Sequence, residues 1–409
     1  MRERRAVITG LGVVAPAGRR FEDFFGNLLA GKSCIKEINF FDASKYASRH
    51  AGMIDRLDAE EVFPKRLLKK LDRFSQMSLL AAHDAFSDSG LNLEKEDRER
   101  VGIIMGNALG GWGFAEEELR DLWKNGVRDV SPYQATAWFP AAPQGQISVH
   151  YSLKGFAKTI ISDIASSHLA LGYAKQAIET GKADIILAGG AEAPVSPYAL
   201  LCCNASGELS KRGRYTPFDV SRDGYVIGEG AALVVVEEFA RASARGARIY
   251  GELKGFGHAS DGMSPVECDP EGSGIARAMD AAMAEAGINC GQVDYLMPAG
   301  NGGVKPDTGE ARAINKALKK ELEGGLAVGV PKSLFGNLLG ASGAVDAAIA
   351  CLAIMNGIAP TATGCTQPEP GWRWAKESGT SVKKEIKNAL INSTGRGGVH
   401  ASLVIGKME

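Results

Sequence analysis

Short apolar runs, separated by longer segments of helical period, constrain the fold of this chain more than any other feature. Leu71–Ser89, Gly274–Ala286 and Gly343–Met355 place apolar residues three or four positions apart, which is the period of a helix. Strands that alternate with such helices predict an α/β fold whose mainly parallel sheet is covered on both faces. The expected strands are Ala6–Val14, Val101–Met105, Ala183–Gly190, Ala231–Val236, Val293–Met297, Leu326–Val330, Ala389–Asn392 and Ala401–Ile405.

The composition and charge of the chain argue against several classes of function. The 409 residues are 45% hydrophobic, which is enough for a large core. The 47 basic and 48 acidic side chains give a net charge of −1 without a basic block, so we expect neither a nucleic-acid groove nor a charged membrane patch. The N-terminal Met1–Gly10 lacks the features of a signal peptide, and no uninterrupted apolar window is long enough for a transmembrane helix.

Neither the cysteines nor the glycines form a cofactor or metal motif. The seven cysteines are odd in number, two of them, Cys202 and Cys203, are adjacent, and none has the spacing of metal ligands. This pattern predicts reduced thiols in a cytoplasmic protein. Gly10-Leu11-Gly12 lacks the third glycine and the following acid of a dinucleotide loop. We therefore expect no cofactor and no metal.

Several motifs, taken in order, make the sequence specific. They are Val7–Val14, Leu71–Phe74, Ala183–Ala193, Pro217–Asp219, Arg222–Gly230, Lys332-Ser333 and Gly336–Gly343. Together they resemble the elongating β-ketoacyl-acyl-carrier-protein synthases over essentially the whole chain. The resemblance implies a thiolase-like α/β fold, with two similar βαβαβαββ halves in a five-layered αβαβα arrangement. It also implies a first half that spans residues 1–250 and a second half that spans residues 251–409.

The same resemblance identifies the positions that carry the family's chemistry, and this chain has lost them. Active members attack with a cysteine at the start of a buried helix, where Ile164 stands here. Their two histidines stabilise the developing enolate and oxyanion, and Ala299 and Asn337 occupy those positions. The loop whose aromatic residue gates the acyl pocket carries Thr394 and Arg396 instead. Alone, the chain is therefore expected not to condense acyl chains.

Other polar residues near these positions are interpreted as structural. His168 follows Ile164 by one helical turn, and Ser166 and Ser167 precede it, but no thiol or activated hydroxyl is indicated beside them. Polar residues at a helix start commonly satisfy its free amides. Lys332 and Asp346 keep family positions, and without a thiol we assign them to loop structure.

One non-catalytic branch of the family matches this pattern, namely the chain-length factors, or ketosynthase β subunits, of type II polyketide synthases. The segment Glu116–Ser148 resembles that branch, although Ile164 stands where many of its members carry glutamine. The resemblance implies a pseudo-two-fold heterodimer with a catalytic ketosynthase α subunit, which acts on chains held by an acyl-carrier protein.

The resemblance also places part of a shared substrate tunnel in this chain. Large aromatic rings are rigid and could limit the depth of such a tunnel. The alternative is that the same residues only pack an interface. The candidate tunnel residues are Leu109, Trp112, Phe114, Tyr133 and Trp138.

Two other functions remain open on the sequence alone. The chain could be a thiolase-fold acyltransferase or hydrolase that uses other residues. It could also be a scaffold that contacts no substrate. Covalent loading of the isolated chain would favour the first of these over a length-determining subunit.

Overall fold

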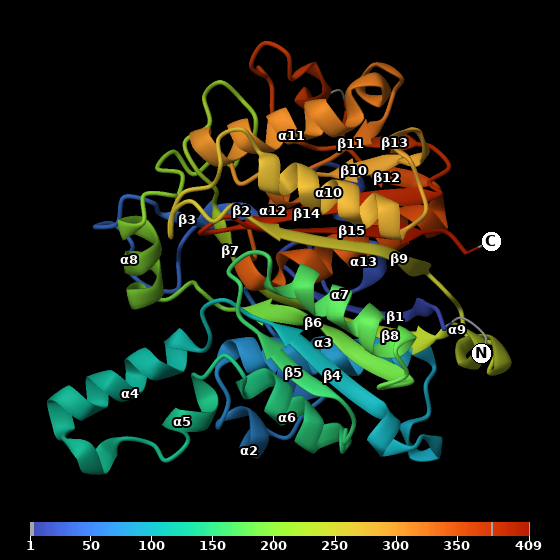
Figure 1. Ribbon diagram of the computed structural model, residues 1–409. Coiled ribbons are helices and arrows are strands. Elements are labelled where there is room, and N and C mark those ends of the chain that lie inside the picture. Colours follow the sequence, from blue (N-terminus) through green and yellow to red (C-terminus); the bar gives the residue numbers. More distant parts are fainter. Residues whose placement is uncertain (1–3, 378, 409) are drawn as a thin grey trace.

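The computed structural model describes residues 4–377 and 379–408. Its main sheet has ten strands in the order β11-β10-β14-β15-β9-β1-β8-β6-β4-β5. The strands from β1 to β8 come from the first half of the chain, and those from β9 to β15 come from the second half. Figure 1 shows the main-sheet strands of the first half below those of the second half.

The first half contains one edge of the sheet and the helices around it. Its strands are β1 (Ala6–Val14), β2 (Ile35–Glu37), β3 (His50–Gly52), β4 (Val101–Gly106), β5 (Ala157–Ile160), β6 (Ile185–Glu192), β7 (Ile227–Gly228) and β8 (Gly230–Glu238). Its helices are α1 (Phe21–Leu29), α2 (Lys65–Leu68), α3 (Arg73–Ser89), α4 (Trp112–Asn125), α5 (Gln134–Ala137), α6 (Ala142–Tyr151), α7 (Ser166–Glu179), α8 (Pro197–Ala205) and α9 (Phe239–Ala244). The helices α4 and α5 protrude at the lower left of Figure 1.

The second half repeats the arrangement with fewer additions. Its strands are β9 (Gly251–Ser260), β10 (Tyr295–Met297), β11 (Ala327–Val328), β12 (Ile358–Pro360), β13 (Ser381–Lys383), β14 (Asn388–Gly395) and β15 (Val399–Gly406). Its helices are α10 (Ser273–Glu285), α11 (Val304–Glu323), α12 (Lys332–Phe335) and α13 (Ser342–Asn356).

The two halves have the same topology. In chain order, the main-sheet strands of each half lie as third, second, fourth, fifth and first: β5-β4-β6-β8-β1 and β11-β10-β14-β15-β9. In both halves helices link the first four strands, and the last two strands pair antiparallel, β6 with β8 and β14 with β15. The predicted α/β fold with two βαβαβαββ halves is therefore confirmed. The division after residue 250 stays a prediction.

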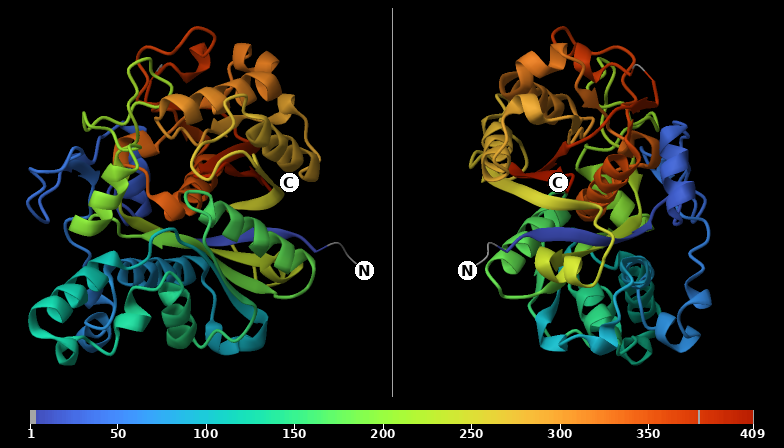
Figure 2. Two further views of the ribbon diagram at one scale, coloured as in Figure 1. Left: turned by 60° about the vertical axis from the view of Figure 1, so that its left-hand side comes forward. Right: turned by 90° about the vertical axis from the view of Figure 1, so that its right-hand side faces the viewer.

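The layers follow from which helices pack on which strands. The central helices α7 and α13 pack against each other between the halves, α3 and α6 cover the outer face of the first half, and α10 and α11 cover that of the second. Figure 2 shows these layers from two further sides. The two halves join where β1 pairs antiparallel with β9, at Val7↔Glu252 and Ile8↔Gly251.

The sheet is mixed, so the prediction of a mainly parallel sheet is wrong. The pairs β4–β5, β4–β6, β10–β11 and β10–β14 are parallel. Each half ends with an antiparallel pair, because no crossover helix separates its last two strands, and the β1–β9 junction adds another antiparallel pair.

Paired glycines let a helix approach the first strand of each half closely. A Cβ at Gly12 would lie 1.9 Å from the carbonyl oxygen of Ala81 in α3. In the second half, a Cβ at Gly257 would lie 2.0 Å from the carbonyl oxygen of Ala278 in α10. Gly10-Leu11-Gly12 is therefore a helix-packing surface, which agrees with its rejection as a cofactor loop.

The most apolar helix of the chain lies at its centre. Residues Leu339–Asn356 form a stretch of 18 residues with a mean hydropathy of 1.5, which length and composition alone would allow to cross a membrane. However, 89% of this stretch is buried inside the molecule, where α13 packs against α7 and both sheet halves. Its hydropathy is accounted for by a position in the protein core.

Candidate functional site

The position of the family nucleophile lies in a tight turn that starts α7. Asp163 has a left-handed φ of 51°, a conformation that aspartate tolerates better than most residues. The hydroxyl of Ser166 donates to the carbonyl oxygen of Asp163 at 2.6 Å and accepts from the N–H of Ser162 at 2.8 Å. The turn is therefore preserved by hydrogen bonds that do not involve the residue at its tip.

Ile164, at the tip of this turn, is packed as a core residue. Its side chain is 5% exposed and belongs to an apolar cluster with Val195, Tyr225 and Leu339. An alkyl side chain offers neither a nucleophile nor a proton acceptor.

Asn337, which the resemblance aligns with one of the family histidines, forms hydrogen bonds within the protein through both Oδ1 and Nδ2. Its Oδ1 accepts from the N–H of Leu339 at 2.9 Å and from the hydroxyl of Ser342 at 3.0 Å. Its Nδ2 donates to the hydroxyl of Tyr215 at 3.3 Å. Burial raises the pKa of Tyr215 well above its usual value, so this phenol stays neutral. The amide of Asn337 therefore holds the loop.

Ala299, which replaces the other histidine, contributes only its backbone. Its N–H and that of Gly300 donate to the two oxygens of Glu310 at 2.7 and 2.8 Å.

The Lys332 ammonium lies 2.8 Å from Asp346, and burial raises the pKa of the Asp346 carboxyl despite this partner. Lys332 and Asp346 therefore form a buried ion pair, which fits a structural role for both residues.

His168 does not take over the missing chemistry. The ring is completely buried, and in the described part of the chain neither ring nitrogen has a hydrogen-bond partner. Desolvation, with the nearby Lys332 charge, lowers the pKa of His168 to about 3. The imidazole is therefore neutral and has no hydroxyl or thiol to activate, which agrees with its structural interpretation.

A cavity of about 650 Å³ opens in front of Ile164. Val266 and Val304 form an apolar rim and are 61% and 60% exposed. Arg396 also lines the cavity: its N–H donates to Asp163 at 2.7 Å, and its guanidinium forms an ion pair with Glu208. This hydrogen-bonded pair raises the pKa of Arg396. The loop that the resemblance expects to carry an aromatic gate is thus fixed at Arg396 by a hydrogen bond and an ion pair.

The other end of that loop carries an arrangement that the sequence did not reveal. The Thr394 hydroxyl lies 3.2 Å from Nδ1 of His400, its partner across the β14–β15 hairpin. Nε2 of His400 lies 2.9 Å from Asp261. Burial lowers the pKa of His400, so its ring is neutral at pH 7 and can accept a proton from a hydroxyl. The sequence gives no signal for this arrangement, because Asp261 lies far from His400 in the chain.

The five predicted tunnel residues do not all lie together. Phe114 is the third residue of α4, and its N–H donates to Asp72 at 2.8 Å. Trp112 and Trp138 are brought together, with ring centroids 6.2 Å apart. Leu109 lies instead against the cluster that contains Ile164. Tyr133 is 39% exposed and lies under the Lys70 ammonium, 4.8 Å from the ring centroid. The tunnel role of each residue stays a prediction.

Two further aromatic residues, which the sequence analysis missed, extend the Trp112–Trp138 pair. Tyr198 of α8 lies 5.0 Å from Trp112, and Phe139 lies 6.1 Å from Trp138, between ring centroids. Glu116 anchors the start of α8 to α4, because its carboxylate accepts from the N–H of Tyr198 at 2.9 Å. We call Trp112, Trp138, Phe139 and Tyr198 the aromatic cluster. The Ser196-Pro197 helix start was the sequence signal for α8.

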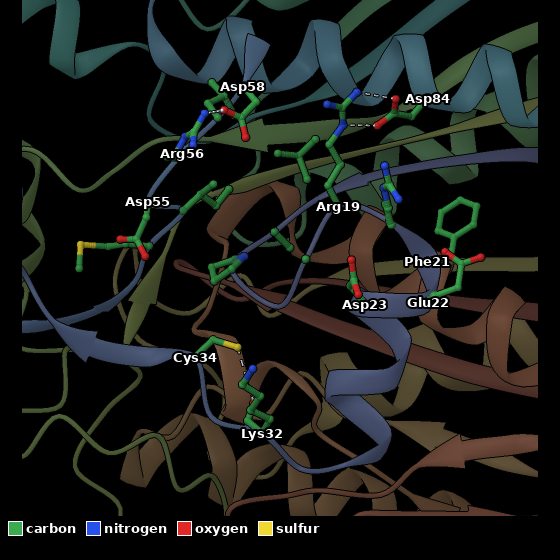
Figure 3. A pocket seen from close by; sticks show the side chains of 18 of the residues that line it. Arg19, Phe21, Glu22, Asp23, Lys32, Cys34, Asp55, Arg56, Asp58 and Asp84 are labelled. Atoms are coloured by element: carbon green, nitrogen blue, oxygen red, sulfur yellow. Dashed lines mark hydrogen bonds and ion pairs between the residues drawn. The ribbon is translucent and has the colours of Figure 1, made fainter. Parts of the chain in front are cut away.

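A second cavity, of about 1120 Å³, lies elsewhere, beside the start of α1 (Figure 3). Its charged groups largely pair with one another: Arg19 binds Asp84 at 2.6 and 2.7 Å, and Arg56 binds Asp58 at 2.8 Å. Ile164 does not line it. Among residues 4–377 and 379–408, no group of three His, Cys, Asp or Glu side chains could hold a metal ion.

Comparisons with known proteins assign this fold and site to a family. Residues 3–242 match the family described as "Beta-ketoacyl synthase, N-terminal domain", and residues 250–366 match "Beta-ketoacyl synthase, C-terminal domain". The chain belongs to the β-ketoacyl synthase family. Among curated relatives of this chain, the 3-oxoacyl-[acyl-carrier-protein] synthase 2 of Vibrio harveyi is 35% identical over 413 residues, with both chains covered completely. That of Coxiella burnetii is also 35% identical, again over 413 residues and with complete coverage.

Three solved structures have a fold similar to that of this chain. A type II polyketide acyl-carrier protein in complex with its ketosynthase matches with a TM-score of 0.90 and 28% identity, over 100% of each chain. The ishigamide ketosynthase/chain length factor matches with a TM-score of 0.90 and 27% identity, also over 100% of each chain. A β-ketoacyl synthase of Burkholderia phymatum is 27% identical, with a TM-score of 0.89 over 99% of this chain and 100% of its own.

Proposed function

We propose that this β-ketoacyl synthase family member does not condense acyl chains itself. It pairs with a catalytic ketosynthase and sets the length of a polyketide chain, which is bound to an acyl-carrier protein and grows by decarboxylative condensation of malonyl units. The observation that carries the proposal is the packing of Ile164, in a preserved turn, as part of the apolar core. Because the turn keeps its geometry but presents only an alkyl group, the site cannot supply a nucleophile, and we infer that it contributes through its shape.

The other two substituted positions support the same conclusion. Ala299 has no side-chain proton to give, and the amide of Asn337 is engaged with Leu339, Ser342 and Tyr215. Decarboxylation requires donors aimed at the oxygen where charge develops. Both positions lack such a donor, so the partner must supply the chemistry.

The surface around β5 supports the pairing. In the described part of the chain β5 pairs on one side only, with β4, and it forms one end of the main sheet. Val149 and Ile161 flank it and are 81% and 59% exposed. A free strand edge beside apolar side chains favours pairing with another chain, and a pseudo-two-fold pair would join two such edges. The two solved complexes named above fit a ketosynthase partner and a carrier protein.

The aromatic cluster supports control of chain length. Trp112, Trp138 and Tyr198 are large, rigid and held near one another by α4, α5 and α8. Each ring can occupy the volume of several methylene groups. Removal of a ring should therefore admit a longer chain in the paired state.

The test is reconstitution with a catalytic ketosynthase and malonyl-loaded carrier protein. The isolated chain should acquire no acyl group, as read by intact mass, whereas the pair should release polyketides. A cysteine-to-alanine change in the partner should abolish the products. Trp112→Gly should lengthen them, with Leu119→Gly on the outer face of α4 as control. Covalent loading of the isolated chain would falsify the proposal.

One observation favours a second candidate function, thioester hydrolysis. Thr394 lies 3.2 Å from His400, and His400 lies 2.9 Å from Asp261, which are the separations of a nucleophile, a base and an acid, although the His400–Asp261 approach lacks hydrogen-bond geometry. The Thr394 oxygen would attack the thioester carbonyl while its proton passes to Nδ1 of His400. The C–S bond would break as the thiolate takes that proton, and water would then cleave the acyl ester to a carboxylic acid and the free hydroxyl.

The exposure of Thr394, only 2%, disfavours this second function. The test incubates the purified chain with an acyl N-acetylcysteamine thioester and measures thiol release. Release that is lost in Thr394→Val would establish the hydrolase. Absence of release by the unmodified chain rejects it, without bearing on the paired function.

A further inference from the structure

One buried carboxylate joins the starts of two helices, α3 and α4, and α4 begins with Trp112 of the aromatic cluster. Asp72 is 3% exposed and precedes α3, where its Oδ1 accepts from the N–H of Phe74 at 2.9 Å. Its Oδ2 accepts from the N–H of Phe114, in the first turn of α4, at 2.8 Å. The carboxylate therefore caps α3 and also binds a free amide of α4.

The backbone of α4 lies directly on Asp72. A Cβ at Gly111 would lie 2.6 Å from the Cβ of Asp72, so the chain just before α4 has no room to shift toward α3. Trp112 is the first residue of α4 and Phe114 the third. The position of the Trp112 ring, and with it the aromatic cluster, thus depends on the bond between Asp72 and Phe114.

We propose that Asp72 is a positioning residue for chain length, which holds the first turn of α4 so that Trp112 limits the depth of the substrate tunnel. The inference rests on the proposed function and deepens it. Asp72 touches neither substrate nor reacting atoms. It acts through α4. Loss of its hydrogen bond to Phe114 should change the tunnel depth at Trp112 and leave the rate of condensation unchanged.

The charges around Asp72 make its effect depend on pH. Burial raises the pKa of Asp72 to about 6, although the two backbone N–H groups and the Arg73 charge oppose the rise. Glu117, on α4, raises the pKa further, while Arg73, on α3, is itself paired with Glu229 at 2.7 Å. Protonation below about pH 6 replaces one acceptor oxygen with a hydroxyl and weakens the bond to Phe114.

Stability and length control should therefore respond to pH in opposite directions. A carboxyl whose folded pKa is raised contributes most stability below its ordinary pKa and loses that contribution as pH rises through about 6. The hold on α4 needs the charged form and is lost as pH falls through the same value. A residue with only a structural role would not separate the two readouts.

The test uses the reconstituted pair and two variants that keep the cap of α3. Serine in Asp72→Ser still caps α3 but is too short to reach Phe114, and Asp72→Asn turns an amide donor or a single acceptor toward two N–H groups. The matched control is Asp97→Ser, because Asp97 caps a short helix through Glu99, away from α4. Product lengths are read by mass spectrometry, and total malonyl consumption is read as the condensation rate.

Asp72→Ser should raise the ratio of longer to shorter products about tenfold, the effect of losing one hydrogen bond to a charged group. The control should leave the ratio unchanged. In the unmodified pair the ratio should rise as pH falls through about 6, and it should be flat with pH in Asp72→Ser.

An unchanged ratio in an assembled Asp72→Ser pair overturns the inference. If neither Asp72 variant assembles, a ratio that does not vary with pH in the unmodified pair overturns it equally. A wild-type pair that makes no polyketide rejects the proposed function instead, which keeps the two failures distinct.

Discussion

The two central helices begin in the same way, although only one begins at the nucleophile position. Before α7 the chain reads Asp163-Ile164-Ala165-Ser166, and before α13 it reads Leu339-Gly340-Ala341-Ser342. Asp163 and Leu339 have left-handed φ angles of 51° and 47°, each three residues before its helix begins. Ser166 and Ser342 both close the turn with a hydroxyl hydrogen bond. The turn is therefore a device of the fold in both halves, and its presence alone does not indicate catalysis.

The two turns differ in the space at their tips. Ile164 fills an apolar pocket, whereas a Cβ at Gly340 would lie 2.6 Å from Glu192 and 2.7 Å from the N atom of Ala108. The first half has room for a side chain that could carry chemistry, and the second half has none. Ile164 thus places an unreactive side chain at the tip of a turn whose backbone both halves share.

The largest expected effect comes from placing the same side chain at both tips. Gly340→Ile should prevent folding, with a loss of more than about 4 kcal/mol, because the added atoms meet backbone and a buried carboxylate that cannot move away. Soluble yield and thermal unfolding measure the effect. A soluble Gly340→Ile protein with an unchanged transition would show that the two tips are equally roomy.

Truncation at the other tip should be smaller but clear. Ile164→Ala should lower the free energy of unfolding by about 3 kcal/mol, since it leaves a cavity among buried apolar residues. Urea denaturation provides the measurement. Ile161→Ala, at a side chain that is 59% exposed, is the matched control and should change stability by less than about 0.5 kcal/mol. Equal losses at both positions would contradict the packed interpretation of Ile164.

The carboxylate beside the second tip should make stability depend on pH. Burial raises the pKa of Glu192 to about 8, against the hydrogen bonds that it accepts from Ala108 and Leu109. A raised pKa stabilises the fold at low pH, so the free energy of unfolding should fall by about 1.4 kcal/mol per pH unit as pH rises from the ordinary carboxyl pKa toward 8, and it should level off above 8. Chemical denaturation across pH 6 to 10 tests this slope. Glu192→Gln should remove it, and a slope that persists in that variant would assign it to another group.

The smallest expected difference compares the two serines that close the turns. Ser166 both accepts from Ser162 and donates to Asp163, whereas Ser342 donates to Asn337. Ser166→Ala should therefore cost about 2 kcal/mol and Ser342→Ala about 1 kcal/mol, because the first change also leaves a backbone N–H without its partner. Both are measured by urea denaturation. The reverse order would show that the turn of α13 depends more on its hydroxyl.

The fold could be predicted from sequence because its signals are local or ordered along the chain. Strand and helix periods located β1, β4, α3 and α13, and the motif order indicated two equivalent halves. The antiparallel pairs were not anticipated by the strand pattern, since a buried strand reads alike whichever way its neighbour runs.

The site was predictable where a residue type was missing and was not predictable where partners are distant in sequence. Ile164, Ala299 and Asn337 are visible as substitutions within recognisable motifs. The Arg396–Glu208 and His400–Asp261 pairs join segments far apart in the chain, and no periodicity announces them. Tyr198 contacts Trp112 because α8 packs on α4, and the sequence gives no signal for this packing.

The repeated helix start also bears on what this fold needs in order to form. The turn before α13 forms around Gly340, which has no reactive side chain, so formation of this turn does not require a nucleophile. A single substitution at the tip of the turn before α7 can therefore remove a reactive group without rebuilding the backbone around it. The scaffold of this fold and the chemistry at its helix starts are separable properties.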